Sequence, residues 1–277
     1  MEYLNTDSSE DFEIINNSNP TNSKNENGPT YLDGEMTADT ILSIENNPYI
    51  IENNFTVPEG KILTINPGVI IWPKNNDPFN PVNLTAKGTI IINGTKEAPV
   101  KFTSLKKIPQ RADYGQALSI EATSKNSILN NVIFEYGDLF MIFIIPMVSI
   151  QGTDVKISNA IFREAEDMAL SLIDSNVLIE NTLFENNMLT ALSVDGSRVE
   201  IKNCQFKNNS LGIEINNHSK TVFENNIFTY NQMPLFADLT NEINFDKSNQ
   251  LLNNKSNEIL FSTESSANTP TSPPTPF

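Results

Sequence analysis

VKISNAIFREA (155–165) returns with substitutions as VLIENTLFENN (177–187), VEIKNCQFKNN (199–209) and TVFENNIFTYN (221–231). Each version holds a phenylalanine at the same place, and these phenylalanines are 22 residues apart: Phe162, Phe184, Phe206 and Phe228. A fixed period in the twenties is typical of stacked repeat units, each too small to bury a core alone. The period therefore predicts an elongated solenoid.

The positions around each phenylalanine predict short strands joined by corners. Val155 and Ile157 are two residues apart, as in a strand with one buried face, and the same pair recurs in later copies. An asparagine stands three residues before each phenylalanine, where we expect a turn, because asparagine tolerates left-handed φ. Stacking predicts a core column of phenylalanines and a hydrogen-bonded asparagine ladder. The asparagines are Asn131, Asn159, Asn181, Asn203 and Asn225.

The region before these repeats also alternates apolar runs with turn residues, but here the turn residues are Gly and Pro. It reads V-P-x-G-x-x-L-T-I-x-P-G-V within 49–71, then G-T-I-x-x-x-G-T-x-x-x-P-V-x-F-T-S within 83–104. This order resembles the first coils of right-handed parallel β-helix proteins of the pectate-lyase-like superfamily. The resemblance implies an all-β, single-stranded right-handed parallel β-helix of roughly eight to nine coils, about 22 residues per regular coil. It also implies a bacterial cell-envelope or extracellular protein.

Composition predicts three segments along the chain. Residues 1–33 are Asn/Ser-rich and are expected to form a flexible leader, 34–262 the β-helix domain, and 263–277 a Ser/Thr/Pro-rich tail. The first residues lack the features of a signal peptide. Either the protein is cytoplasmic, or a signal or lipid-anchor segment is absent from this chain; the resemblance favours the second.

Charge and residue usage exclude several classes of function. The chain has 18 basic and 34 acidic residues, a net charge of −16, so we expect neither nucleic acid nor an anionic membrane as a partner. No apolar run is long enough to span a membrane. One cysteine and one histidine cannot form an ordinary zinc site, so we expect no metal. We also expect no cofactor, and we expect the protein to be a monomer.

Candidate binding residues lie on one predicted edge and on two loops. The residue after each phenylalanine alternates in charge, which fixes the register between coils or forms a sugar-binding groove. Two insertions, 72–83 and 105–116, bring aromatic and basic residues that suit carbohydrate or carboxylate binding. The candidates are Glu135, Arg163, Glu185 and Lys207 on the edge, and Trp72, Phe79, Arg111 and Tyr114 on the loops.

A six-residue apolar insertion follows Gly137 and breaks the period. It is either buried against the flank of the solenoid or exposed as a partner-binding loop. Its residues are Leu139, Phe140, Met141, Ile142, Phe143 and Ile144.

No catalytic group stands out in the sequence. We find no repeated-Asp hydrolase motif, and the candidate bases Arg163, Arg198 and Lys220 fall on different edges of the predicted coil. The sequence therefore favours a protein that is not an enzyme, with no catalytic residues. It would be a non-catalytic binding or scaffold module whose partner is a polysaccharide or an envelope protein. The alternative is a polysaccharide lyase or hydrolase acting on an acidic polysaccharide.

Overall fold

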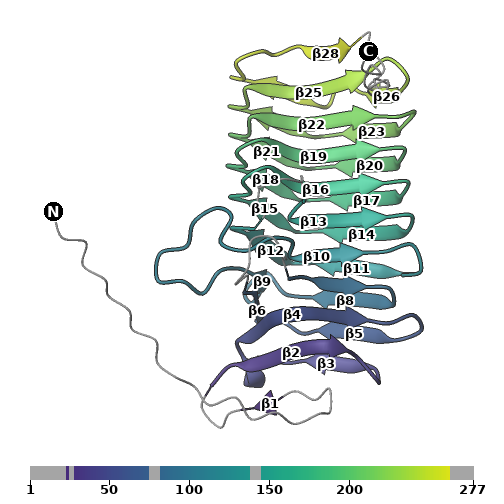
Figure 1. Cartoon of the computed structure of the whole chain (residues 1–277). Coiled ribbons are helices and arrows are strands. Elements are labelled where there is room, and N and C mark those ends of the chain that lie inside the picture. Colours follow the sequence, from purple (N-terminus) through teal and green to yellow (C-terminus); the bar gives the residue numbers. More distant parts are fainter. Residues whose placement is uncertain (1–22, 25–27, 75–81, 138–144, 263–277) are drawn as a thin grey trace, which may run out of the picture.

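The computed structural model describes residues 23–24, 28–74, 82–137 and 145–262. Short parallel strands form coils that stack into a column, with the N-terminal coil at one end and the C-terminal coil at the other (Figure 1). Each regular coil contributes three strands, one to each of three faces. The predicted right-handed parallel β-helix is confirmed.

The strands follow one another in the repeating order face 1, face 2, face 3. Face 1 consists of β2 (Thr30–Glu35), β4 (Tyr49–Val57), β7 (Leu84–Ala86), β10 (Leu118–Ile120), β13 (Val148–Gln151), β16 (Met168–Ile173), β19 (Thr190–Asp195), β22 (Leu211–Asn216), β25 (Met233–Asp238) and β28 (Ile259–Ser262). Face 2 is a nine-stranded sheet of β3 (Thr40–Leu42), β5 (Ile62–Ile65), β8 (Thr89–Asn93), β11 (Ser127–Asn130), β14 (Asp154–Ser158), β17 (Asn176–Glu180), β20 (Arg198–Lys202), β23 (Lys220–Glu224) and β26 (Glu242–Phe245). Face 3 consists of β6 (Ile70–Pro73), β9 (Val100–Phe102), β12 (Val132–Glu135), β15 (Ile161–Arg163), β18 (Leu183–Glu185), β21 (Gln205–Lys207), β24 (Ile227–Thr229) and β27 (Gln250–Leu252).

Two further elements lie near the N-terminal end. The short strand β1 (Ser23–Lys24) pairs antiparallel with β2, and the 3₁₀ turn η1 (Ile44–Asn46) follows β3. The predicted domain boundary at residue 34 falls inside β2, the first strand of face 1, which begins at Thr30. No helix in the described segments is long and apolar enough to cross a membrane.

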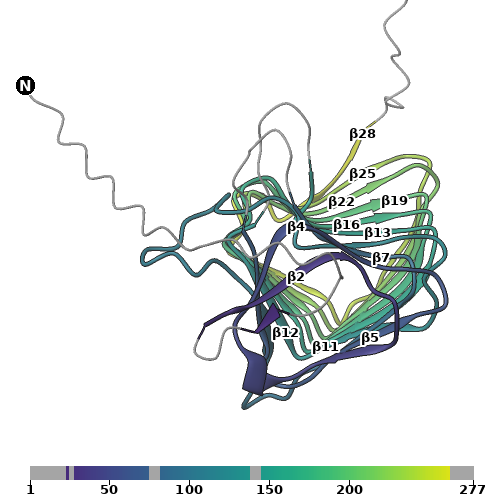
Figure 2. The same ribbon diagram turned by 60° about the horizontal axis from the view of Figure 1, so that its bottom comes forward.

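The core is a stack of like residues, as the period predicts. Phe134 pairs in register with Phe162, and Phe162 with Phe184. The rings of Phe184 and Phe206 lie 4.7 Å apart at an angle of 2°, and both side chains are fully buried. Phe102 extends this column toward the N-terminus, and Leu251 takes the place of phenylalanine in the last coil. The coils wrap around this single core (Figure 2).

The corner between faces 2 and 3 uses the predicted asparagines, but they do not form the predicted ladder. Asn159, Asn181, Asn203 and Asn225 all have φ between 51° and 55°, the left-handed region that asparagine tolerates. Within the described residues no side-chain hydrogen bond joins two members of this column. The turn directs these side chains away from the core, so they shape the corner and form no ladder with one another. Asn159 donates instead to Asn130 Oδ1 of the preceding coil, at 2.9 Å.

A different asparagine column, three residues after each phenylalanine, forms the ladder. The Asn209 amide donates to Asn231 Oδ1 at 3.0 Å and to the Phe184 carbonyl at 3.1 Å. Asn187 donates to Asn209 Oδ1 in the same way, at 2.9 Å. Asn187, Asn209 and Asn231 are all nearly fully buried. A serine ladder plays the equivalent role at the corner between faces 1 and 2, where Ser175 N donates to Ser197 Oγ at 3.0 Å.

Candidate functional site

The predicted charge ladder exists on face 3 as a set of stacked side chains. Glu135 pairs in register with Arg163, Arg163 with Glu185, and Glu185 with Lys207. Arg163 Nε donates to Glu135 Oε2 at 2.7 Å, whereas Arg163 and Glu185 are 3.9 Å apart. Glu135 is only 6% exposed and also accepts a hydrogen bond from Thr103. The ladder thus holds neighbouring coils in register, and a ligand-binding role for it stays a prediction.

The 105–116 loop reaches the same corner of the coil. Arg111 forms an ion pair with Glu164 at 2.8 Å and donates to the carbonyl of Asn186 at 2.8 Å. The structure thus brings Arg111 close to the ladder. Tyr114 is fully buried, and its hydroxyl lies 2.8 Å from the carbonyl oxygen of Glu135. Its assignment to a binding surface is therefore corrected, because a side chain with no exposed surface anchors the loop and cannot contact a ligand.

The remaining predicted residues lie further along face 3 or outside the described residues. Trp72 on β6 packs against the core with Lys74 beside its ring. The register places Trp72 in the column of the charge ladder, two strands before Glu135 and separated from it by Thr103. Phe79 lies outside the described residues. So does the whole predicted partner loop: Leu139, Phe140, Met141, Ile142, Phe143 and Ile144.

Face 1 carries a polar column that sequence reasoning did not single out as a site. Ser119, Ser149, Ser171 and Ser193 occupy equivalent positions on successive strands, between core-facing apolar residues. The next position in the column is Glu214 on β22, which pairs in register with Ser193. Glu214 is half-buried and faces outward, since Ile213 and Ile215 on either side of it are buried. A carboxylate therefore ends a row of small hydroxyls that runs from Thr56 to Ser193.

A second carboxyl, Asp167, lies where the chain enters β16, at the edge of the same face. Asp167 is 5% exposed. Burial raises the pKa of Asp167 above its ordinary value, and the nearby carboxylates of Glu214 and Glu166 raise it further. The register places Glu214 two strands along the column from β16.

This pair of carboxyls can do acid–base chemistry. A carboxyl whose pKa is raised by burial and like charge retains its proton closer to neutral pH and can donate it. The more exposed Glu214 supplies a second carboxylate on the same face. Paired carboxyls with different environments are the arrangement by which glycoside hydrolases cleave their substrates.

A signal for Glu214 is present in the sequence. The motif MVSI (147–150) returns as ALSL (169–172), ALSV (191–194) and GIEI (212–215), so a glutamate replaces serine in the fourth copy. Asp167 has no comparable signal, because its environment depends on packing between coils.

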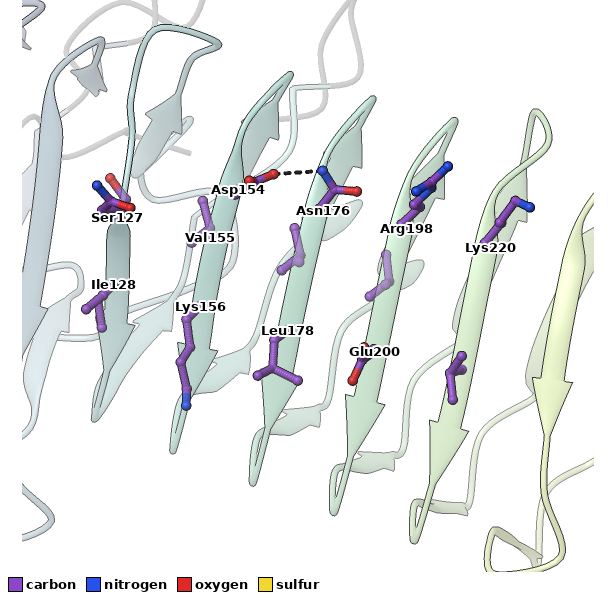
Figure 3. Close-up of a pocket in the computed structure, with 14 residues that line it drawn as sticks. Ser127, Ile128, Asp154, Val155, Lys156, Asn176, Leu178, Arg198, Glu200 and Lys220 are labelled. Atoms are coloured by element: carbon purple, nitrogen blue, oxygen red, sulfur yellow. Dashed lines mark hydrogen bonds between the residues drawn. The ribbon is translucent and has the colours of Figure 1, made fainter.

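A second concave surface lies on face 2. It is a groove of about 740 Å³ lined by outward side chains of β11, β14, β17, β20 and β23, including Ile128, Lys156, Leu178, Arg198 and Glu200 (Figure 3). Asp154 accepts a hydrogen bond from Asn176 at 2.7 Å within it. Among the described residues no group of three or more His, Cys, Asp or Glu side chains is placed to hold a metal ion.

Two family models match the chain. Residues 34–138 match a pectate-lyase-like β-helix domain, and residues 146–272 match a right-handed β-helix region. No curated protein matches the sequence significantly.

Two solved structures of phage tailspikes are similar at low identity. The first is the enzymatically active domain of tailspike protein 2 of bacteriophage CBA120, at 11% identity and a TM-score of 0.32, with 77% of this chain and 37% of that one covered. The second is the full-length tailspike protein 2 of an Escherichia coli O157:H7 bacteriophage, at 11% identity and a TM-score of 0.23, with 77% and 33% covered. The chain thus spans about a third of the length of these tailspike chains.

These comparisons correct one prediction. The sequence favoured a protein that is not an enzyme, but residues 34–138 match the model of a pectate-lyase-like β-helix domain. The prediction failed because it relied on the absence of a local motif, whereas in a solenoid groups far apart in sequence meet on one face. The two matched regions and the three-faced coil together show that this chain is a right-handed parallel β-helix protein.

Proposed function

We propose that this protein hydrolyses a polysaccharide bound along face 1, with Asp167 as the general acid and Glu214 as the second carboxylate. The observation that carries the proposal is the raised pKa of Asp167, caused by burial and then by Glu214 and Glu166. The pectate-lyase-like match supports polysaccharide as the substrate class.

The chemistry needs two proton movements. Asp167 donates its proton to the glycosidic oxygen as the bond from that oxygen to the anomeric carbon breaks, and the leaving sugar departs as an alcohol. Glu214 accepts a proton from a water molecule, whose oxygen bonds to the anomeric carbon. Asp167 and Glu214 lie on strands two apart, and Glu214 is in register with Ser171, four residues after Asp167. About 10 Å across the strands and about 13 Å along them put the two Cα atoms about 16 Å apart. The two side chains must therefore extend toward each other over face 1 to reach one glycosidic bond.

Electrostatics favour a neutral sugar at the cleavage point. Burial and the charges of Glu214 and Glu166 all raise the pKa of Asp167. A uronate placed there would meet like charges, on a protein whose net charge is already −16. Acidic polysaccharides are tested beside neutral ones, because they would be the substrates of the alternative, a lyase or hydrolase. We further propose that the protein acts at the cell surface or in the extracellular space, a location supported by its match to a pectate-lyase-like β-helix domain.

The test is a panel of neutral and acidic polysaccharides, with reducing ends and unsaturated products measured in parallel. We expect new reducing ends without an unsaturated product, and a loss of at least about 100-fold in Asp167→Asn and in Glu214→Gln. Glu59→Gln, an exposed carboxyl in a distant turn, is the matched control and should keep full activity. Unsaturated products would indicate a lyase and overturn the hydrolytic mechanism. Full activity in Asp167→Asn, or no cleavage of any polysaccharide, would overturn the proposed site.

A further inference from the structure

We propose that face 2 is a docking surface for a second copy of this chain. In this dimer the two β-helix axes run antiparallel, and a two-fold axis lies along β17. The sequence predicts a monomer, but the pattern of outward side chains on face 2 is self-complementary about that strand. This inference does not depend on the proposed function.

The middle outward column of face 2 carries the pattern. From β11 to β23 it reads Ile128, Lys156, Leu178, Glu200 and Val222, each paired in register with the next (Figure 3). A two-fold axis along β17 places Leu178 opposite Leu178 of the other copy. It places Lys156 opposite Glu200, and Ile128 opposite Val222. An interface of this kind is isologous, so every such contact occurs twice.

The first outward column obeys the same symmetry. Asp154 on β14 and Arg198 on β20 lie one strand on either side of Asn176, so Asp154 of one copy faces Arg198 of the other. Asp154 accepts a hydrogen bond from Asn176 within the chain. The side chain of Arg198 has no hydrogen bond or ion pair with any described residue. Docking gives this exposed cation a carboxylate partner.

The third outward column of face 2 consists of Ser158, Glu180 and Lys202. It brings one pair of like charges together, and each of these charges is already compensated within its own chain. Ser158 faces Lys202, and Glu180 lies on the axis opposite its own copy. Each Glu180 is already paired with Lys156 of its own chain at 3.1 Å. The two glutamates are therefore each neutralised by a lysine that also faces Glu200 of the other copy.

Charge balance separates this patch from the rest of the molecule. The outward positions of β14, β17, β20 and β23 hold four basic and four acidic side chains, whereas the whole chain has 18 and 34. A neutral patch on a strongly acidic protein lets two copies approach where the rest of the surface repels. Its members are Lys156, Arg198, Lys202, Lys220, Asp154, Glu180, Glu200 and Glu224.

The other face-to-face arrangement is disfavoured by charge. A two-fold axis along the β-helix axis would keep each strand opposite its own copy. Lys156 would then face Lys156, and Glu200 would face Glu200, which places like charges together on the axis. The antiparallel arrangement replaces both clashes with opposite-charge pairs.

The expected dimer is weak and depends on concentration. Five strands of five residues cover on the order of 400 Å² of sheet, and a stable interface buries about 800 Å² per partner. Face 1, with Asp167 and Glu214, stays open in each copy because docking uses a different side of the coil.

Charge reversal tests the pairing by sedimentation equilibrium over a concentration series. Wild type should approach twice the chain mass of 30.9 kDa at high concentration. Arg198→Asp and Asp154→Arg should each raise the dissociation constant at least about 10-fold, and the double variant should restore it. Lys255→Asp, the same charge change on an exposed loop away from face 2, should dimerise like wild type. A wild-type mass that stays at 30.9 kDa at every concentration, or a double variant no better than the single ones, overturns the proposal.

Cross-linking locates the two-fold axis. A short bismaleimide spans the roughly 10 Å between packed sheets, so Leu178→Cys should give a covalent dimer. Val222→Cys lies on the same face with 38% exposure. Its two copies would be offset by about 19 Å along the sheet as well as by the gap of about 10 Å between the sheets, about 22 Å in all, and should not be linked. The native Cys204 does not compete, because it is buried and burial raises the pKa of its thiol to about 12. Equal cross-linking of both variants would overturn the antiparallel geometry.

Discussion

Replacing Asn209 with alanine removes four buried hydrogen bonds from the asparagine ladder. Asn209 donates to the Phe184 carbonyl and to Asn231 Oδ1, and its own Oδ1 accepts from the side-chain and backbone nitrogens of Asn187. A buried hydrogen bond contributes about 1 kcal/mol net, and each partner left unsatisfied costs about 1–3 kcal/mol unless water reaches it. We therefore expect Asn209→Ala to lower the free energy of unfolding by about 4 kcal/mol.

Urea unfolding followed by circular dichroism measures this loss. Asn208→Ala is the matched control, because its amide makes one exposed hydrogen bond, to Asn186 Oδ1. We expect it to cost about 1–2 kcal/mol, since alanine also disfavours the left-handed φ of 55° at that position. A loss below about 1 kcal/mol for Asn209→Ala would refute the view that the ladder holds the coils together.

The near-isosteric change Asn209→Asp separates the donors from the acceptor. The carboxylate can still accept from Asn187, but it faces the Phe184 carbonyl and Asn231 Oδ1 with no proton to donate. Its pKa would be raised in the folded state, so the destabilisation should be largest at neutral pH. It should diminish as the pH falls through that raised pKa, because the protonated acid can donate again.

Three further results are expected. Asp167→Asn should have a higher thermal midpoint than wild type at neutral pH, because the raised pKa of Asp167 makes its ionised form destabilising. The difference between the two midpoints should vanish as the pH falls through that raised pKa. A variant less stable than wild type at neutral pH would contradict this. Burial alone would raise the pKa of Asp113, but hydrogen bonds from Lys106, Ser104 and Gln110 outweigh it and lower the pKa. Asp113→Asn should therefore lower the free energy of unfolding by about 1 kcal/mol above pH 4 and leave it unchanged below the lowered pKa. Urea unfolding at a series of pH values measures this. Cys204 should resist iodoacetamide in the folded protein and react fully in denaturant, as mass spectrometry would show; rapid labelling of the native state would contradict its burial.

Much of the fold could be predicted because a solenoid repeats its contacts with its sequence. The spacing between Phe162 and Phe184 directly predicts a pair in register, and the ring stack follows from that register. The asparagine ladder was assigned to the wrong column. Both columns repeat with the same period, so the period cannot tell an asparagine that turns outward at Asn181 from one that points inward at Asn209.

The candidate site was harder to predict than the fold. The charge ladder around Arg163 is visible in the sequence, but its partner Glu135 is buried and serves the register between coils. Glu214 could have been found as the break in the serine column. The raised pKa of Asp167 could not, because it depends on burial by neighbouring coils and on a glutamate two strands away.

The alkaline limb of the pH–rate profile tests the central claim most directly, because a general acid loses activity as it deprotonates. Glu166 raises the pKa of Asp167 by its charge alone, so Glu166→Gln should move that limb to lower pH and leave the rate at acid pH unchanged. An alkaline limb that stays in place in Glu166→Gln would contradict the assignment of Asp167 as the acid.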